Sequence, residues 1–304
     1  MGLRPWEIEQ MFDVIIVGGS YAGISAGLQL ARARRKVLVI DAGERRNRFA
    51  HSSHGFLGQD GRDPGAIAEE ARGQLLAYPT VQWLTQSAVS ASREDDGFVV
   101  GTAHGKQFKG RRLILASGVV DELPAVPGLA ERWGQSVFHC PYCHGYELDG
   151  GPIGVLAASP VAIHHAMMLP DWGPTTFFLN GVFEPDAEQL GQLQRRGVQL
   201  EREGVVAVVG ERVNVTLASG RVVELAGLFT QPLTRMASPL PAMLGCAFED
   251  GPMGQFIKVD AMRETSVPGV FACGDAAVAA GNVAIAVGDG ARTGGAAHHS
   301  LIFR

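Results

Sequence analysis

The chain has 304 residues, of which 46% are hydrophobic and 19% charged. This length suits two domains that each bury a core, and the composition excludes fibrous, disordered and mini-protein classes. The net charge is −5, so the chain lacks the excess of basic residues that binding to a nucleic-acid phosphate backbone requires. We therefore predict no nucleic-acid partner. The 40 glycines are nearly double the usual share of about 7%, which indicates many turns and close backbone approaches.

The first ten residues and the longest uncharged stretch give no sign of export or of a membrane span. Residues 1–10 lack an apolar signal core, and the longest uncharged stretch, 150–170, contains glycines, prolines and two histidines that do not suit hydrocarbon. We therefore predict a cytoplasmic protein without a membrane span. In such a compartment the four cysteines are expected to be redox or structural thiols and not a disulfide framework.

The first pattern in chain order is a strand–turn–helix–strand unit. Strands are predicted over 13–17 and 36–41, and between them GGSYAG (18–23) leads into a helix over 24–33. A dinucleotide needs a tight turn, bare backbone and helix amides at its pyrophosphate, and an acid at its ribose. The residues that meet these needs are Gly18, Gly19, Ser20, Ala22, Gly23 and Asp41, with Ser20 in place of the usual middle glycine.

The next segments complete a first domain. A helix is predicted near 66–76, with short strands near 81–84 and 98–100. A buried strand over 111–118 then ends in a turn at Gly118, and its abrupt stop indicates a domain boundary. His51 and His54 fall in a Ser/Gly-rich loop and are interpreted as loop residues.

Two cysteines at C-x-x-C spacing, Cys140 and Cys143, open the second segment. Such thiols can close a small disulfide loop and exchange two electrons. Zinc would need four ligands, and although His139 and His144 flank the pair there is no second C-x-x-C, so we predict no metal site. CPYC also suits a glutaredoxin, but those domains are about a third of this length and place the pair near their start.

The remaining segments contain a second strand–turn–helix–strand unit and then lead back to the first domain. Strands over 153–157 and 175–180 flank a helix over 161–169, which indicates an internal duplication, and a proline-containing loop at 230–241 leads back to the first domain. The stretch 267–277 is a strand that enters a turn at Gly274 and Asp275, followed by a helix from about Asn282. A Gly-Asp turn far downstream of a Rossmann opening is typical of flavoproteins that bind two dinucleotides, and the helix amides would face the flavin ring.

The chain resembles the low-molecular-weight thioredoxin reductase family over nearly all of 12–301. IIVGGSYAG (15–23), LILASG (113–118), CPYC (140–143), TSVPGVFACGD (265–275) and AIAVGDGA (284–291) carry the resemblance. CPYCHGYE (140–147) is most similar to the branch of gliotoxin-type dithiol oxidases and other atypical reductase-like flavoproteins, in which histidine follows the second cysteine.

This resemblance implies an α/β protein with two Rossmann-like, three-layer ββα domains, the second inserted into the first. An FAD domain would span 1–121 and 239–304, and a nicotinamide-type domain with the cysteine pair would span 122–238. The implied cofactor is FAD, with further contacts from Gly118, Gly274, Asp275, Val283 and Ala284. A homodimer and a small dithiol, a disulfide or a thioredoxin-like protein as partner are also implied.

The second nucleotide loop departs from the family pattern. Aligned with the G-x-G-x-x-A motif, residues 157–162 read AASPVA, so both glycines are absent and Pro160 occupies the turn. After the next strand, where a basic cluster would bind the NADPH 2′-phosphate, the chain has Glu184 and no arginine. Losing these contacts is predicted to weaken NADPH binding by about three decades or more.

The leading interpretation is therefore an FAD-dependent thiol–disulfide oxidoreductase that does not use NADPH, either a dithiol oxidase or a reductase with another donor. By resemblance, Cys143 faces the flavin and Cys140 exchanges with the outside thiol. His144 is the candidate acid/base, with His139 in reserve. Two alternatives stay open: an ordinary NADPH-dependent thioredoxin reductase, and a non-catalytic flavoprotein redox sensor.

Overall fold

The computed structural model describes residues 11–94 and 97–304, so the prediction about a signal segment at 1–10 lies outside the described residues. The described residues divide into two compact units: unit 1 comprises 11–46, 65–94, 97–120 and 234–304, and unit 2 comprises 47–64 and 121–233. The longer segment of unit 2 spans 121–233, beside the expected domain over 122–238. Residues 47–64 differ from the expectation, because they pack with unit 2 and not with the segments that flank them in the sequence.

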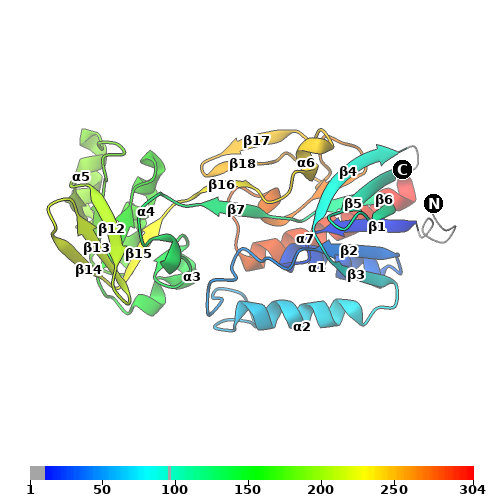
Figure 1. Cartoon of the computed structure of the whole chain (residues 1–304), viewed down its shortest axis with the longest axis horizontal. Helices are drawn as coiled ribbons and strands as arrows, with labels where there is room; N and C mark the ends of the chain where they lie inside the picture. The colour runs from blue at the N-terminus through cyan, green and yellow to red at the C-terminus, as the bar shows by residue number, and fades with distance from the viewer. Residues whose placement is uncertain (1–10, 95–96) are drawn as a thin grey trace. The chain divides into compact units, whose positions relative to one another are not determined.

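Unit 1 is built on a seven-stranded sheet of order β3-β2-β1-β6-β5-β4, with β19 also paired to β6 (Figure 1). The strands are β1 (Phe12–Val17), β2 (Val37–Asp41), β3 (Val81–Thr85), β4 (Ala88–Glu94), β5 (Gly97–Thr102), β6 (Gln107–Leu115) and β19 (Val270–Ala272). The strands β3, β2, β1, β6 and β19 run parallel, whereas β4, β5 and β6 are antiparallel neighbours. A parallel sheet of this kind requires cover on both faces.

Both faces of this sheet are covered, in three layers. Val14 and Ile16 of β1 face one core with helices α1 (Tyr21–Arg32) and α7 (Val283–Phe303), and helix α2 (Pro64–Leu76) also contributes Ala71 and Leu75 to it. Ile15 and Val17 point into a second core beneath β4 and β5. The predicted three-layer ββα architecture is confirmed. The rest of unit 1 comprises helix α6 (Leu240–Met243) and the antiparallel pair β17 (Phe248–Gly251) and β18 (Gly254–Ile257).

The packing of α1 against α7 accounts for part of the glycine excess. A Cβ at Gly290 would lie 2.1 Å from the backbone oxygen of Ala22, and one at Gly294 would lie 2.4 Å from that of Ala26. Any side chain at these positions would push the helices apart, so the close contact depends on glycine.

Unit 2 has a five-stranded parallel sheet of order β11-β10-β9-β15-β8. Its strands are β8 (Val137–Phe138), β9 (Ile153–Leu156), β10 (Thr175–Phe178), β11 (Gln199–Glu201) and β15 (Gly227–Thr230). An antiparallel sheet of β12 (Val205–Val209), β13 (Val213–Leu217) and β14 (Val222–Leu225) packs on one face through Val213, Val215 and Leu228. Helices α4 (Ile163–Met168) and α5 (Ala187–Arg195) cover the other face, and Asp186 and Gln189 form a capping box at the start of α5.

Strands β7 (Val119–Glu122) and β16 (Leu233–Met236) carry the chain between the units and pair with each other. Two predicted helices have different bounds. The first begins at Tyr21 and not at residue 24, and the expected helix over 161–169 is a short α4 flanked by 3-10 turns, because Pro160 and Pro170 interrupt the hydrogen-bond ladder. No helix among the described residues is long and apolar enough to cross a membrane.

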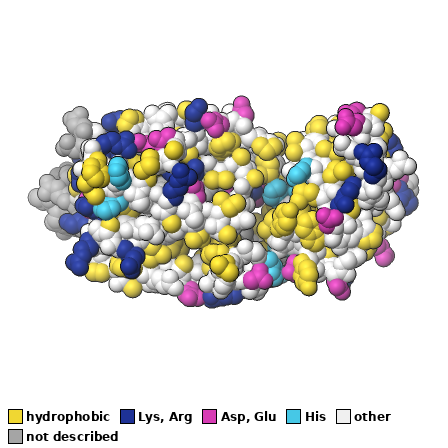
Figure 2. All heavy atoms as spheres, turned by 180° about the vertical axis from the view of Figure 1, so that it is seen from behind, with side chains coloured by type: hydrophobic (Ala, Val, Ile, Leu, Met, Phe, Trp, Pro, Cys, Tyr) yellow, Lys and Arg dark blue, Asp and Glu magenta, His cyan; other side chains and the backbone are white. Residues whose placement is uncertain are grey.

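On the face in Figure 2, basic side chains lie among acidic and hydrophobic ones.

Candidate active site

The glycine turn after β1 is held in a conformation that excludes side chains. Gly18 has a φ of +102°, and a Cβ there would lie 2.3 Å from the backbone oxygen of Ala116. A Cβ at Gly23 would meet the oxygen of Gly18 at 1.9 Å. Helix α1 begins directly after Ser20, whose side chain makes no capping hydrogen bond. First-turn amides of α1 are therefore not capped by Ser20 and can receive an anion.

Asp41, at the end of β2, closes this turn. Its Oδ1 accepts a hydrogen bond of 2.8 Å from the Gly19 amide, and its Oδ2 accepts one of 3.2 Å from the Gly43 amide. A carboxylate has further lone pairs beyond these two bonds, so Asp41 can still accept from a ribose hydroxyl. The predicted ribose contact stays a prediction.

Two buried polar atoms beside this turn lack partners among the described residues: the hydroxyl of Ser117 and the indole N–H of Trp83. Ser117 directly follows Ala116, whose backbone lies close to Gly18, and the Trp83 ring lies against Gly19. Gly118, the next residue, has open space where a Cβ would point. Buried polar groups normally have partners, so unsatisfied atoms around a bare glycine turn fit a polar dinucleotide such as FAD.

The Gly-Asp turn after β19 is held by groups that sequence reasoning missed. The Gly274 amide donates to Asp289 Oδ2 at 2.9 Å, and the same oxygen lies 2.6 Å from Nη2 of Arg263 in a nearly buried ion pair. Asp275 Oδ2 lies 2.8 Å from Nη1 of Arg46. Arg46 is distant in sequence from the turn, and Asp289 lies within the AIAVGDGA stretch (284–291), but neither was predicted to contact the turn.

Helix α7 begins at Val283, close to the expected position, and its N-terminus is capped by Asn282. The Asn282 side chain accepts a 2.8 Å hydrogen bond from the Ile285 amide. Val283 and Ala284 therefore occupy the first turn of a 21-residue helix, where backbone N–H groups have no partner within the helix. Their contact with FAD stays a prediction.

In unit 2, Cys140 and Cys143 form a disulfide. The short helix α3 (Pro141–His144) starts after Cys140, and the Cys143 amide donates to the Cys140 carbonyl oxygen at 3.2 Å. Tyr142, between the two cysteines, is 73% exposed and contacts the Trp172 ring edge-on. The C-x-x-C spacing thus places both sulfurs on one helical turn, as a dithiol/disulfide couple requires.

His144 follows the second cysteine and stacks on Phe138, with ring centroids 4.4 Å apart. Burial lowers its pKa to about 4, an effect that His54 reinforces and Glu147 opposes. The ring is therefore neutral near pH 7 and offers one N–H donor and one lone pair. The structure thus brings His144 into the helical turn of the cysteines, but its catalytic role remains a prediction.

His54, interpreted from the sequence as an ordinary loop residue, lies beside this group. Its Nε2 is 3.3 Å from Glu147 Oε1 and 3.0 Å from the Ser52 hydroxyl, and its Nδ1 is 3.6 Å from Asp60 Oδ1. The segment 47–64 thus supplies a histidine between two carboxylates next to the CHGYE motif. Only the fold of the chain joins His54 and Glu147, which are 93 residues apart in sequence.

His139, which directly precedes Cys140, packs against a second histidine, His165. The ring of His139 lies 5.5 Å from that of His165 on α4, and His165 is 4% exposed. Burial and the neighbouring His139 and His164 lower the pKa of His165 to about 3. No group of three or more His, Cys, Asp or Glu side chains that could hold a metal is found among the described residues.

These buried histidines predict acid sensitivity. The folded-state pKa of His165 lies below the usual 6.5, so the unfolded chain binds more protons at lower pH and stability is lost as pH falls below 6.5. Between about pH 7 and 5 the loss for His165 is expected to be about 2 kcal/mol. Urea unfolding at both pH values should show a smaller loss in His165→Phe and an unchanged loss in the exposed-site control His104→Gln. An unchanged loss in His165→Phe would contradict this account.

The degenerate loop of unit 2 has the predicted composition and one unexpected neighbour. After β9 the chain passes through Ala157 and Ser159 into a 3-10 turn that begins at Pro160. Glu184, beyond β10, is paired with Arg202: Nη2 lies 2.6 Å and Nε 3.0 Å from the same carboxylate oxygen. The stretch after β10 contains no arginine, as the sequence shows, but Arg202 from the end of β11 lies beside Glu184 in space.

Comparison with known proteins identifies the family. The family model described as pyridine nucleotide-disulphide oxidoreductase matches residues 12–290. The chain belongs to the pyridine nucleotide-disulphide oxidoreductase family. As a member it is a thioredoxin reductase-like, FAD-binding disulfide oxidoreductase, so the non-catalytic alternative is set aside.

Three relatives of this oxidoreductase span nearly its whole length. "Thioredoxin reductase tcpT" of Claviceps purpurea is 32% identical, and the alignment covers 95% of this chain and 94% of the relative. A crystal structure of an oxidoreductase from Agrobacterium tumefaciens is 58% identical, with a TM-score of 0.94 over 97% of this chain and 99% of that one. The crystal structure of HlmI is 35% identical, with a TM-score of 0.90 over 97% and 94% of the two chains. The predicted resemblance to the gliotoxin-type branch is confirmed.

Proposed function

We propose that this oxidoreductase passes two electrons between a dithiol and FAD through the Cys140–Cys143 pair and does not take hydride from NADPH. The observation that carries the proposal is the loop over 157–162. It has no glycine, and Pro160 lacks an amide hydrogen where a dinucleotide would need one. Glu184 would repel a 2′-phosphate at the end of β10.

In the proposed reaction, a thiolate of the substrate attacks Sγ of Cys140, the Cys140–Cys143 bond breaks, and Cys143 leaves as a thiolate. The second substrate sulfur then displaces Cys140, which completes the product disulfide and leaves both cysteines reduced. His144 accepts a thiol proton at its free ring nitrogen, and the new thiolate on Cys143 favours this protonation by raising the pKa of His144. When bound, FAD supplies two-electron acceptor chemistry.

The proposed cofactor sites follow the two units. FAD is assigned to unit 1, at the Gly18–Gly23 turn, Asp41, Gly118, Gly274, Asp275 and the start of α7 at Val283 and Ala284. Unit 2 carries the cysteine pair on a nicotinamide-type fold. We further propose a cytoplasmic homodimer whose partner is a small dithiol, a disulfide or a thioredoxin-like protein, with no nucleic-acid partner.

One observation favours the alternative of an NADPH-dependent thioredoxin reductase. Arg202 pairs with Glu184, at the position where the family resemblance puts the 2′-phosphate contacts, and both side chains are more than half exposed. A phosphate could compete with Glu184 for this guanidinium. The alternative therefore makes Arg202 essential, whereas the proposal gives it no role in turnover.

Anaerobic mixing of the FAD-loaded protein with NADPH, NADH and a small dithiol, each in turn, tests the two functions. The dithiol is expected to bleach the flavin absorbance, and NADPH at about 1 mM to leave it unchanged, because affinity lost by about three decades leaves little binding. Rapid bleaching by NADPH that disappears in Arg202→Ala would establish the alternative. The control Arg212→Ala removes an exposed arginine of unit 2 outside this pair.

A further inference from the structure

Unit 1 contains a cavity of about 270 Å³ that the functional site does not use. Four arginines line it: Arg93 of β4, Arg111 and Arg112 of β6, and Arg304 after α7. In the register of β6 with β1, Arg112 lies opposite Val14, whereas the glycine turn follows Val17. The cavity therefore lies toward the opposite end of the parallel strands from the proposed FAD site.

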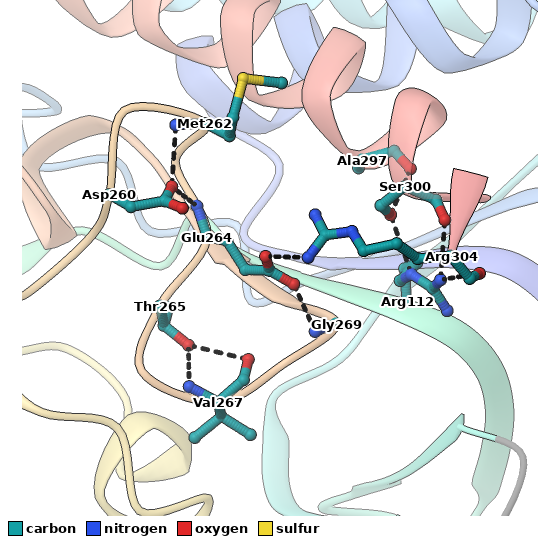
Figure 3. Close-up of polar contacts among 10 residues, drawn as sticks. All are labelled: Arg112, Asp260, Met262, Glu264, Thr265, Val267, Gly269, Ala297, Ser300 and Arg304. Atoms are coloured by element: carbon teal, nitrogen blue, oxygen red, sulfur yellow. Dashed lines mark hydrogen bonds and ion pairs between the residues drawn. The ribbon is translucent and has the colours of Figure 1, made fainter. Parts of the chain in front are cut away.

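Glu264 carries the only side-chain carboxylate among the described residues that line the cavity. It is 8% exposed, and both of its oxygens are occupied: Oε1 accepts from the Gly269 amide at 2.8 Å, and Oε2 pairs with Nη1 of Arg304 at 2.5 Å. Figure 3 shows Glu264 between these two partners. Its charge is thus directed at one of the four guanidinium groups.

Arg112 is fixed in place by the last turn of α7. Its Nε donates to the Ser300 hydroxyl at 2.8 Å, and its Nη2 donates to the backbone oxygens of Ser300 at 2.9 Å and Arg304 at 3.1 Å (Figure 3). Together with the Arg111 carbonyl oxygen, which accepts from Nη1 at 2.9 Å, these oxygens hold the guanidinium in one orientation. Arg112 is therefore a rigid positive charge on the cavity wall, which lowers the entropy cost of holding a ligand.

The cavity holds more positive charge than its own carboxylate offsets. Burial lowers the pKa of Arg112 below its usual value, and the charges of Arg111 and Arg304 lower it further against the opposing effect of Glu264. Arg111 has only a 3.5 Å contact with Asp13, which does not line the cavity. Among the described residues Arg93 has no ion-pair partner, and its position on β4 is exposed. An added anion would relieve this repulsion.

We propose that this arginine cavity binds a small multivalent oxyanion, a phosphate ester or a polycarboxylate with two or more negative charges. Guanidinium groups bind both kinds of oxyanion through paired hydrogen bonds, and several of them favour a ligand with several charges. The volume of about 270 Å³ admits a small organic ligand. Phe98 and Pro268 supply apolar wall beside the charges, which suits an organic ligand with a carbon skeleton.

Isothermal titration of the FAD-loaded full chain tests the proposal, because FAD then occupies its own phosphate site. Pyrophosphate and citrate represent the two ligand classes, and acetate is the monovalent control. The proposal expects saturable binding of at least one of the two, with one ion per chain, and none for acetate. The tighter probe identifies the class.

Variants locate the binding. Arg93→Ala/Arg111→Ala is expected to weaken it by about tenfold or more for each guanidinium removed, because a charge-assisted hydrogen bond contributes about 1.5–3 kcal/mol. Arg212→Ala in unit 2 changes the net charge by one and should leave the affinity within about twofold. No saturable binding up to about 10 mM, or equal affinity in the double variant, would overturn the proposal.

Two aspartates of the chain itself are further candidates to compete with a ligand for the arginines. Asp95 and Asp96 precede Gly97 and lie outside the described residues, so a variant must test whether they take the place of a ligand. Under the proposal, Asp95→Asn/Asp96→Asn binds the same probe as the parent chain with equal or higher affinity. Binding by this variant alone would show that the chain neutralises its own arginines, and the proposal would be wrong.

Discussion

Cys143→Ser is expected to retain yellow FAD while thiol-driven reduction of the flavin falls by roughly three orders of magnitude or more. Serine cannot form the disulfide that accepts electrons from the substrate, and a hydroxyl is not a redox group. FAD retention should not change, because Cys143 lies in unit 2 and the proposed FAD residues lie in unit 1. Anaerobic rapid mixing with a dithiol, followed at the flavin band, measures the effect.

Cys246→Ser is the matched control. Cys246 is a free, buried thiol of unit 1, and burial raises its pKa, so little thiolate is present for exchange. This variant should be reduced at the rate of the parent chain. If Cys143→Ser is also bleached quickly by thiols, the Cys140–Cys143 pair is not the route of the electrons.

Gly18→Ala is expected to remove FAD from the purified protein and to destabilise unit 1 by about 3 kcal/mol or more. A φ of +102° strains any residue with a Cβ, and that Cβ would also lie 2.3 Å from a backbone oxygen that cannot move without displacing β6. The ratio of FAD to protein and the urea midpoint are the two measurements.

Gly105→Ala separates the two causes. Gly105 has a φ of +77° but open space around the added Cβ, so only the backbone cost of about 1–2 kcal/mol applies. FAD content should be unchanged in this variant, because Gly105 lies in the β5–β6 connection, away from the proposed cofactor residues. Equal losses of FAD in both variants would refute the assignment of the Gly18 turn to the cofactor.

The parts of the fold that the sequence predicts are those set by local pattern. The apolar run of β1, the glycine turn and the C-x-x-C spacing each impose their geometry within a few residues. Boundaries were less accurate where local signals conflict: Tyr21 and Gly23 read as turn residues, yet both lie in α1, because the tight turn is complete at Ser20. The antiparallel strands β12–β14 were not predicted, although β13 alternates between buried and partly exposed residues.

Only the part of the candidate site formed by neighbours in the sequence could be predicted. Cys140, Cys143 and His144 are adjacent in sequence, but His54 meets Glu147 only because residues 47–64 pack with unit 2. Arg46 and Arg202 reach Asp275 and Glu184 from distant strands or loops in the same way. Long-range ion pairs depend on the tertiary arrangement, and a single sequence carries no periodic signal for them.

The pairing of β7 with β16 gives the molecule a modular character. Paired strands lie about 4.8 Å apart, so the two ends of the segment 121–233 of unit 2, near residues 120 and 234, are neighbours in space. A short hairpin could close unit 1 over this gap without stretching its backbone. The same junctions offer a grafting point at which an inserted lobe of another relative could replace 121–233 and bring its own choice of electron donor.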